Sequence, residues 1–325
     1  LSPGSYRILA FKDENQNSIF EPGKEAVSFK KEKIELTESI SGLNLAVTPS
    51  KKRLRFIESK SVTGGVFLLF EGQPDKVEIN SQTDKLNDYK ISHKPKSDSV
   101  NIWFDAKKLD IGTNQSENLK FSYKADTLSG NASVFYRQSA TEDLTMSSAV
   151  TSAVPFRDFT VESNYPLTQI SPEKWQLTQD SVAVNFSAKI DSTNANRIRI
   201  SSTFPPSKKF SLTIPRGSVQ SYYATNSKAY RFDFNTEKEE NFGLLTFNLI
   251  NKPASKFWLQ LLDESGKIKY SHYTAGSQVK FSGLQPGRYT VRMLVDNNNN
   301  GFWDEADFRT QTYAEDVYFY EKIME

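Results

Sequence analysis

The sequence contains no cysteine, which excludes disulfides, zinc–thiolate sites and thiol chemistry. Only two histidines are present, His93 and His272, and neither has a second type of metal ligand beside it at a useful spacing. No run of about 18 apolar residues exists, so no segment is expected to span a bilayer as a helix. The formal net charge is only +2, which gives no electrostatic reason to expect nucleic acid or an anionic membrane as a partner.

Helical patterns are also missing, because no window shows an apolar stripe with capping residues. Apolar and polar residues alternate instead along most of the chain, for example over 66–70, 100–104 and 244–249. β-branched and aromatic residues dominate these runs, and Gly, Pro, Asn, Asp and Ser separate them. A strand that is apolar on one side must bury that side against a second sheet. The pattern therefore predicts an all-β protein of tandem Ig-like or prealbumin-like β-sandwiches in an extended array.

Changes in composition divide the 325 residues into four predicted parts, since one small core does not usually serve a chain of this length. Residues 1–48 are expected to be the C-terminal half of a prealbumin-like sandwich. Residues 52–150 and 154–239 are expected to form one β-sandwich each, and the second of these is expected to be Ig-like. Residues 241–325 are expected to form a complete prealbumin-like sandwich that carries an Asn- and Asp-rich loop.

One pattern occurs twice, with a constant offset of 283 residues. The letters LSPGSY begin at residue 1 and lead to Asp13, and the letters LQPGRY begin at residue 284 and lead to Asp296. The same offset is expected to match three later pairs: Phe20 with Trp303, Ile34 with Val317, and Leu36 with Phe319. We therefore expect two copies of one module, a short strand that feeds an acidic loop, and we expect the chain to begin inside the first copy.

The second acidic loop has the ligand spacing of an EF-hand-type calcium loop, with oxygen-bearing side chains at positions 1, 3, 5, 9 and 12. Gly301 at position 6 permits the sharp bend, and Trp303 is expected to pin the loop to the core. The predicted Ca²⁺ ligands are Asp296, Asn298, Asn300, Phe302 through its carbonyl, Asp304 and Asp307. The same residue types also suit a metal-free hairpin, because Asn and Asp favour tight turns. In either case the expected role is structural rather than catalytic.

The first acidic loop matches the calcium pattern less well. Ser18 stands where the second loop has glycine, Lys24 stands at position 12, and an acid follows one residue late. We expect this loop to bind Ca²⁺ more weakly or not at all. Its candidate ligands are Asp13, Asn15, Asn17, Ile19, Glu21 and Glu25.

The sequence over 279–291 resembles the closing strands of prealbumin-like sandwiches of the carboxypeptidase-regulatory or collagen-adhesin B type. With the acidic loop over 296–307, it is similar to the Ig-like domain-containing surface lipoproteins of Bacteroidota. The resemblance implies an exported protein at the bacterial outer membrane or cell surface, held by an N-terminal lipid anchor that this sequence does not contain. We expect other envelope proteins as partners, and an outer-membrane β-barrel that serves assembly, export or uptake is one candidate.

No enzyme motif of the GxSxG, HExxH or phosphate-binding glycine-loop type is present, so we expect a non-enzymatic structural or protein-interaction subunit. The alternative is a carbohydrate-binding or adhesin module of the cell surface, which would need exposed aromatic side chains. The candidates for such a platform are Trp175, Tyr222 and Tyr223. Trp103 and Trp258 lie in alternating runs and are expected to be buried in cores.

Overall fold

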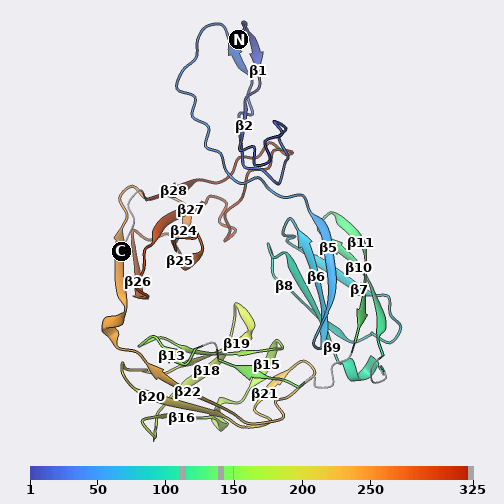
Figure 1. The fold of residues 1–325 in the computed structure, drawn as a ribbon, viewed down its shortest axis with the longest axis vertical. Helices are drawn as coiled ribbons and strands as arrows, with labels where there is room; N and C mark the ends of the chain where they lie inside the picture. The colour runs from blue at the N-terminus through green and yellow to red at the C-terminus, as the bar shows by residue number, and fades with distance from the viewer. Residues whose placement is uncertain (110, 112–114, 138–142, 149, 321–325) are drawn as a thin grey trace. The chain divides into compact units, whose positions relative to one another are not determined.

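The computed structural model describes residues 1–325 except 110, 112–114, 138–142, 149 and 321–325. The described residues form β-strands and three short 3-10 helices (Figure 1), which confirms the predicted all-β fold of sandwiches. In this part of the chain, no helix has the length and apolar character needed to cross a membrane. The residues group into two compact units, one made of 54–241 and the other of 1–53 together with 242–325. The first and last predicted parts thus share a unit, while the fourfold division itself stays a prediction.

The first sandwich of the 54–241 unit has sheets with the strand orders β5-β6-β9-β8 and β11-β10-β7, and every pair is antiparallel. The elements are β5 (Arg55–Val62), β6 (Gly65–Glu71), β7 (Val77–Ser81), β8 (Tyr89–His93), β9 (Ser99–Phe104), η1 (Ala106–Leu109), β10 (Glu117–Ala125) and β11 (Leu128–Tyr136). Alternate residues of both sheets bury one core, which includes Leu68, Ile102 and Phe121. The alternation of the sequence therefore corresponds to an inner and an outer face of each sheet.

The second sandwich of this unit has sheets with the orders β12-β14-β19-β18 and β13-β22-β20-β16-β17, and a separate pair, β15-β21. Its elements are β12 (Met146–Ser147), β13 (Ser152–Ala153), β14 (Phe159–Ser163), β15 (Leu167–Ile170), η2 (Pro172–Lys174), β16 (Gln176–Gln179), β17 (Val182–Ala183), β18 (Ser187–Asp191), β19 (Asn194–Ser201), β20 (Lys209–Ile214), β21 (Val219–Ser221), β22 (Tyr230–Thr236) and η3 (Glu239–Asn241). Stacked phenylalanines dominate the core, and the rings of Phe159 and Phe234 lie 3.8 Å apart, nearly parallel.

The two sandwiches of this unit share apolar contacts at their junction. Trp103 of β9 belongs to the same core cluster as the residues of the second sandwich, and its ring lies edge-on to Tyr165 at 5.8 Å. Gly64, in the turn between β5 and β6, adopts a φ of +68°, and a Cβ there would lie 2.2 Å from the Tyr165 ring. Glycine is required at this position because both the backbone angle and the close approach exclude a side chain.

The other unit contains a sandwich formed by the end of the chain. Its sheets have the orders β23-β26 and β25-β24-β27-β28. The strands are β23 (Gly243–Asn248), β24 (Lys256–Leu262), β25 (Ile268–Thr274), β26 (Gln278–Leu284), β27 (Thr290–Asp296) and β28 (Val317–Phe319). Phe257, Leu261 and Val291 are among the buried residues of its core.

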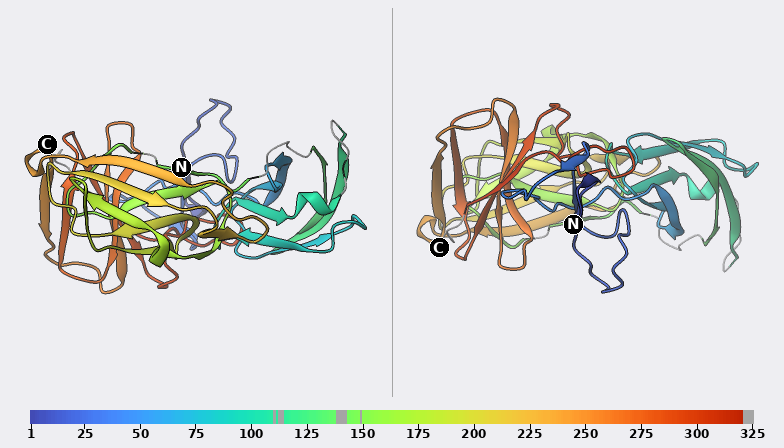
Figure 2. Two further views of the ribbon diagram at one scale, coloured as in Figure 1. Left: turned by 90° about the horizontal axis from the view of Figure 1, so that it is seen from below. Right: turned by 90° about the horizontal axis from the view of Figure 1, so that it is seen from above.

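The first residues of the chain form two short antiparallel pairs in this unit, β1-β4 and β2-β3. Their bounds are β1 (Gly4–Tyr6), β2 (Leu9–Phe11), β3 (Val27–Phe29) and β4 (Ile34–Leu36). Val27 and Phe29 of β3 bury their side chains together with Ala306, which belongs to the long connection between β27 and β28. The N-terminal segment in blue and this connection in red lie side by side in Figures 1 and 2.

Candidate functional site

The second acidic loop begins at Asp296, the last residue of β27, whose side chain is fully buried. One carboxylate oxygen accepts a hydrogen bond from the backbone N–H of Asn300 at 3.0 Å. The other accepts from the N–H of Gly301 at 2.7 Å and from the hydroxyl of Tyr273 at 2.5 Å. The bond to Asp296 raises the pKa of Tyr273 to about 12. Asp296 therefore holds the start of the loop closed and ties it to strand β25.

Three further predicted ligands of this loop meet at one point. The Oδ2 atom of Asp304 accepts hydrogen bonds from the side-chain amides of Asn298 at 2.7 Å and Asn300 at 2.9 Å. The amide oxygen of Asn298 in turn accepts from the N–H of Asn300, and that of Asn300 accepts from the N–H of Phe302. The structure thus brings together the side chains at positions 3, 5 and 9 of the predicted pattern, while the side chain at position 1 holds the backbone of positions 5 and 6.

Asp307, predicted at position 12, does not reach this point. Its Oδ1 accepts a hydrogen bond from the N–H of Arg309 at 3.0 Å, and its backbone pairs with Thr312. Glu315, which the sequence reasoning missed, reaches the loop instead. Its two oxygens accept from the N–H of Asn297 at 2.6 Å and from the N–H of Asp304 at 2.9 Å. The twelve-residue EF-hand pattern that starts at Asp296 ends at Asp307, so it does not include Glu315.

Two tryptophans anchor the loop through their indole N–H groups. Trp303 donates to the backbone carbonyl of Glu315 at 2.9 Å, and Trp258 donates to the carbonyl of Gly301 at 3.1 Å. Trp258 is only half-buried, so it differs from the expected core residue. Its ring instead lies against Tyr273, 4.7 Å away, which is the residue that binds Asp296.

The first acidic loop repeats these hydrogen bonds. The two oxygens of Asp13 accept from the N–H groups of Asn17 at 3.1 Å and Ser18 at 2.8 Å. The side-chain amide of Asn15 donates to Glu21 at 2.7 Å, as Asn298 donates to Asp304 in the second loop. Ser18 adopts a φ of +58°, a left-handed conformation that costs a residue with a side chain more than it costs Gly301.

Glu25 closes the first loop in the way that Glu315 closes the second. Its side chain is buried, at 2% exposure, and its oxygens accept from the N–H of Glu14 at 3.2 Å and of Glu21 at 3.0 Å. Ile19, the predicted carbonyl ligand, is exposed, and its N–H donates to Asn17. The acid that we placed one residue late in the calcium pattern is therefore the structural counterpart of Glu315.

The strands after the loops correct the predicted alignment of the two copies. Leu9 of β2 pairs with Phe29, and the equivalent Arg292 of β27 pairs with Phe319. Val27 and Phe29 thus occupy the places of Val317 and Phe319, so the expected matches with Ile34 and Leu36 are wrong. The offset grows from 283 to 290 residues because the second copy has seven more residues between its position 9 and its closing glutamate.

We call residues 305–314 the bridging segment, because this stretch, which includes the seven extra residues, packs on the first copy. The ring of Phe308 lies edge-on to Phe20 at 5.2 Å and to Phe29 at 5.5 Å. The ring of Tyr313 stacks on Phe29 at 5.2 Å, and its hydroxyl accepts a hydrogen bond from the N–H of Lys31 at 3.0 Å. The insertion therefore joins the two copies into one unit.

Within the described ranges, no group of three or more His, Asp and Glu side chains is arranged to hold a metal ion. Any ion at either loop would therefore also need asparagine and backbone oxygens. Asn298 and Asn300 direct their amide nitrogens at Asp304, so their amide oxygens would have to turn to this point to bind a hard cation such as Ca²⁺. The residue types of the second loop suit this ion, and the acid that reaches the loop after position 9 is Glu315 rather than Asp307.

Trp175 does not provide the predicted aromatic platform, because it is buried, at 7% exposure. The short helix η2 turns the chain just before this residue, so the indole points inward. Its N–H donates to the hydroxyl of Ser218 at 2.9 Å, which satisfies the polar atom of the buried ring. Ser218 in turn donates to the carbonyl of Pro215 at 2.7 Å. Trp175 thus supports the base of the loop that carries Tyr222 and Tyr223.

This loop, residues 215–228, is built around the side chain of Asn226, which is 1% exposed. The amide oxygen of Asn226 accepts from the N–H groups of Ser218 at 3.0 Å and Val219 at 2.9 Å. The amide nitrogen donates to the carbonyls of Pro215 and Lys228. The side chain makes four hydrogen bonds, which connect the two ends of the loop.

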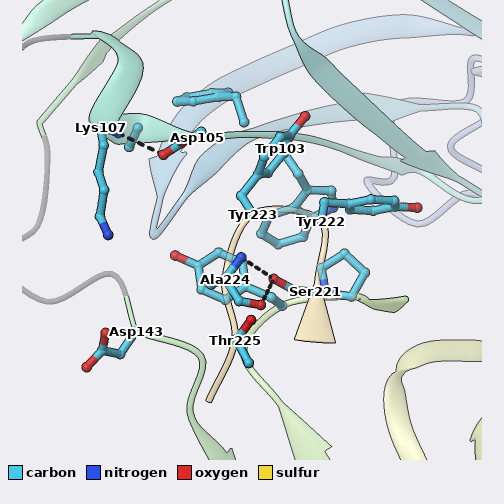
Figure 3. A pocket seen from close by; sticks show the side chains of 13 residues that line it. Trp103, Asp105, Lys107, Asp143, Ser221, Tyr222, Tyr223, Ala224 and Thr225 are labelled. Atoms are coloured by element: carbon cyan, nitrogen blue, oxygen red, sulfur yellow. Dashed lines mark hydrogen bonds between the residues drawn. The ribbon is translucent and has the colours of Figure 1, made fainter. Parts of the chain in front are cut away.

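Tyr222 and Tyr223 lie beside a pocket of about 150 Å³ at the junction of the two sandwiches of the 54–241 unit. Tyr222 is exposed, whereas Tyr223 is half-buried and donates its hydroxyl hydrogen to Asp88 at 3.2 Å. The pocket is lined by Trp103, Phe104, Asp105, Ala106, Lys107, Asp143, Tyr165, Pro166, Ser221, Tyr222, Tyr223, Ala224 and Thr225. In Figure 3, the charged side chains lie on one side of the pocket and the labelled aromatic side chains lie toward the other.

No protein-family model and no curated protein matches this chain. Among solved structures, it is similar to the titin I-band fragment I67–I69 at 9% identity, over 75% of this chain and 94% of that chain, with a TM-score of 0.19. It is similar to native alpha-2-macroglobulin from Escherichia coli, domains MG0-NIE-MG1, at 10% identity, over 76% and 93% of the chains, with a TM-score of 0.22. It is also similar to domains 4–9 of the surface layer protein SbsC at 9% identity, over 84% of this chain and 51% of that chain, with a TM-score of 0.27. At these scores the similarities carry no inference about the function of this chain.

Proposed function

We propose that this chain is a non-enzymatic structural and protein-interaction module of an exported cell-envelope protein. The observation that supports it most is the use of the acidic side chains in the two loops. Asp296 and Glu315 in one loop, and Asp13 and Glu25 in the other, all accept hydrogen bonds from the loop backbone. Carboxylates that accept hydrogen bonds from the backbone of their own loop stabilise its conformation. Catalysis instead needs acids and bases that face a substrate.

Calcium is part of this proposal. The second loop would hold Ca²⁺ through Asp296, Asn298, Asn300 and Asp304, with the carbonyl of Phe302 and the nearby Glu315 as further oxygen donors. An ion at this point would replace the two amide N–H groups as the positive partner of Asp304. The first loop has the same arrangement but a non-glycine residue, Ser18, in a left-handed conformation, which favours weaker binding there.

The location in the cell rests on the resemblance to surface lipoproteins of Bacteroidota. We propose the outer membrane or cell surface, with a lipid anchor outside this sequence as the attachment. The partner proposed is another envelope protein, in particular an outer-membrane β-barrel of an assembly, export or uptake system. Small sandwiches expose strand edges and loop tips, and both can bind a partner without any catalytic group.

The experiment that tests this function is affinity capture of the tagged chain from crosslinked outer membranes of the source bacterium, with quantitative mass spectrometry. The expected result is enrichment of one or a few envelope proteins, a β-barrel among them, over a capture with the tag alone. Fractionation of the cells should place the native protein in the outer membrane. Recovery of the protein in the cytosol, or capture of nothing above the tag control, would overturn the proposal.

A further inference from the structure

The pocket at the junction of the two sandwiches has aromatic walls that are fixed before any ligand binds. Trp103 and Tyr165 are each only 8% exposed and contact one another edge-on at 5.8 Å. The indole N–H of Trp103 donates to Ser92 at 3.1 Å, so the ring is held in place. Tyr222 and Tyr223, which also line the pocket, stand on the loop that Asn226 organises through four hydrogen bonds.

Two carboxylates stand on the other side of the pocket (Figure 3). Asp105 directly follows β9, and it accepts a hydrogen bond from the N–H of Lys107 at 3.2 Å. Asp143 accepts from the hydroxyl of Ser227 at 3.1 Å. Among the residues that the structure describes, neither carboxylate forms an ion pair, and Lys107 is the single basic residue of the lining. Both acids are therefore available to a positive group.

The surroundings of Tyr223 indicate the sign of the local field. Burial raises the pKa of the Tyr223 hydroxyl, and the carboxylates of Asp88 and Asp105 raise it further. The two carboxylates favour positive charge nearby, whereas burial opposes charge of either sign. The faces of aromatic rings also attract cations, through the negative charge of their π-systems.

We propose that this pocket receives the guanidinium group of an arginine presented by a protein partner. A planar guanidinium can stack on an aromatic ring while its N–H fork reaches a carboxylate, whereas a compact ammonium does not stack in this way. The volume of about 150 Å³ suits one side chain. The inference rests on the proposed function as an interaction module and names the chemistry by which a partner is recognised. A preformed pocket also lowers the ordering cost of binding.

The test uses the full chain and two capped peptides, Gly-Arg-Gly and Gly-citrulline-Gly, which differ in charge but hardly in shape. Calorimetry or NMR titration should show saturable binding of the arginine peptide, and at least about tenfold weaker binding of the citrulline peptide. Added salt should weaken the arginine complex. Equal affinity for both peptides, or binding of neither, would overturn the proposal.

Substitutions of the pocket residues test whether the arginine peptide binds at this site. Asp105→Asn and Asp143→Asn should each weaken arginine binding about tenfold, and Tyr222→Ala should weaken it by about fivefold. Asp98→Asn, an exposed acid of the same sandwich outside the pocket, is the matched control and should bind as the parent chain does. Melting curves check that each variant is folded. Unchanged binding by all three pocket variants, or saturable binding of a neutral saccharide that Tyr222→Ala abolishes, would contradict the arginine site.

The same variants separate this inference from the proposed function. If Asp105→Asn/Asp143→Asn still captures the envelope partners of the parent chain, the interaction module stands and the arginine pocket is rejected. If the parent chain captures no envelope protein at all, the proposed function fails whatever the peptides do. If capture falls with the pocket variants but not with Asp98→Asn, both are supported.

Discussion

Glu25 and Glu315 occupy equivalent places in the two loop modules, although 290 positions separate them and the repeat before the loops has an offset of 283. Each accepts the N–H of the residue after the first loop aspartate and the N–H of the acid at position 9. The seven additional residues of the second copy lie between the acid at position 9 and the closing glutamate. The closing glutamate is thus retained in both loops while the chain between changes in length.

Replacement of Glu315 by glutamine should destabilise the unit formed by 1–53 and 242–325. The amide offers one acceptor oxygen, while its NH₂ group would face a backbone N–H. The expected loss is about 1–3 kcal/mol in the free energy of unfolding, because these are charge-assisted hydrogen bonds. Urea unfolding followed by circular dichroism measures it.

Asp307→Asn is the matched control for this prediction, since Asp307 is the acid that the calcium pattern placed at position 12. It bonds to Arg309 rather than to the loop, so its loss should cost less than about 1 kcal/mol. A larger cost for Asp307→Asn than for Glu315→Gln would show that the closing residue has been misassigned.

Calcium should stabilise the chain if the second loop holds it. Calorimetry in 1 mM Ca²⁺ and in EGTA should differ by several degrees in Tm, since an ion at about 100 times its Kd contributes about 2.7 kcal/mol. Asp296→Asn should abolish this difference because it removes the buried carboxylate at position 1. Glu14→Gln, at an exposed side chain beside the first loop, should leave the difference unchanged. Identical melting curves with and without chelator would reject calcium binding.

Phe308→Ala should weaken the contact between the two copies. The half-buried ring touches Phe20 and Phe29, so its removal should cost about 1–3 kcal/mol. A double-mutant cycle with Phe20→Ala should give a coupling energy of about 0.5–1.5 kcal/mol, as for other aromatic pairs. The control is Phe302→Ala, an exposed phenylalanine of the same loop, which should be nearly neutral. A coupling of zero would mean that the bridging segment does not join the copies.

Asp191 should make the 54–241 unit sensitive to acid. Burial alone would raise the pKa of its carboxyl group, but hydrogen bonds from the backbone and hydroxyl of Thr193 and from Arg199 bring it down to about 2. A pKa below the unfolded value means that the stabilisation is present above about pH 4 and is lost as the pH falls toward 2. Asp191→Asn should therefore be less stable than the parent at pH 7, with the gap closing near pH 2.

Chemical denaturation at several pH values measures this gap. Asp233→Asn serves as the comparison, because its carboxylate is exposed and bonds mainly to neighbours on the surface. A gap between parent and Asp191→Asn that stays constant from pH 7 to pH 2 would contradict the assignment.

The sequence predicted the strands well where they alternate and carry β-branched or aromatic residues, as over β6, β9 and β24. Strands with polar residues on both faces escaped notice. β16 reads Gln-Leu-Thr-Gln and buries a single side chain, Leu177. Such strands are defined by hydrogen bonds to their neighbours rather than by a local apolar pattern.

The candidate site was only partly predictable. The turn-forming aspartates and asparagines of both loops follow a local spacing, so their convergence could be anticipated from the sequence. The role of Glu315 could not be predicted, because this residue follows a seven-residue insertion and no local sequence pattern specifies the length of that insertion. Trp175 was misjudged for a related reason: its orientation is decided by the turn of η2 and by Ser218, which lies 43 residues away.

The hydrogen bond between Lys31 and Tyr313 spans 282 residues of chain. Contacts of such high sequence separation form late, because a long loop must close before they contribute. During synthesis, residues 54–241 emerge complete while the first 53 residues still lack the segment that covers Phe29. The apolar surface around Phe29 therefore stays uncovered until residues 305–314 have been made.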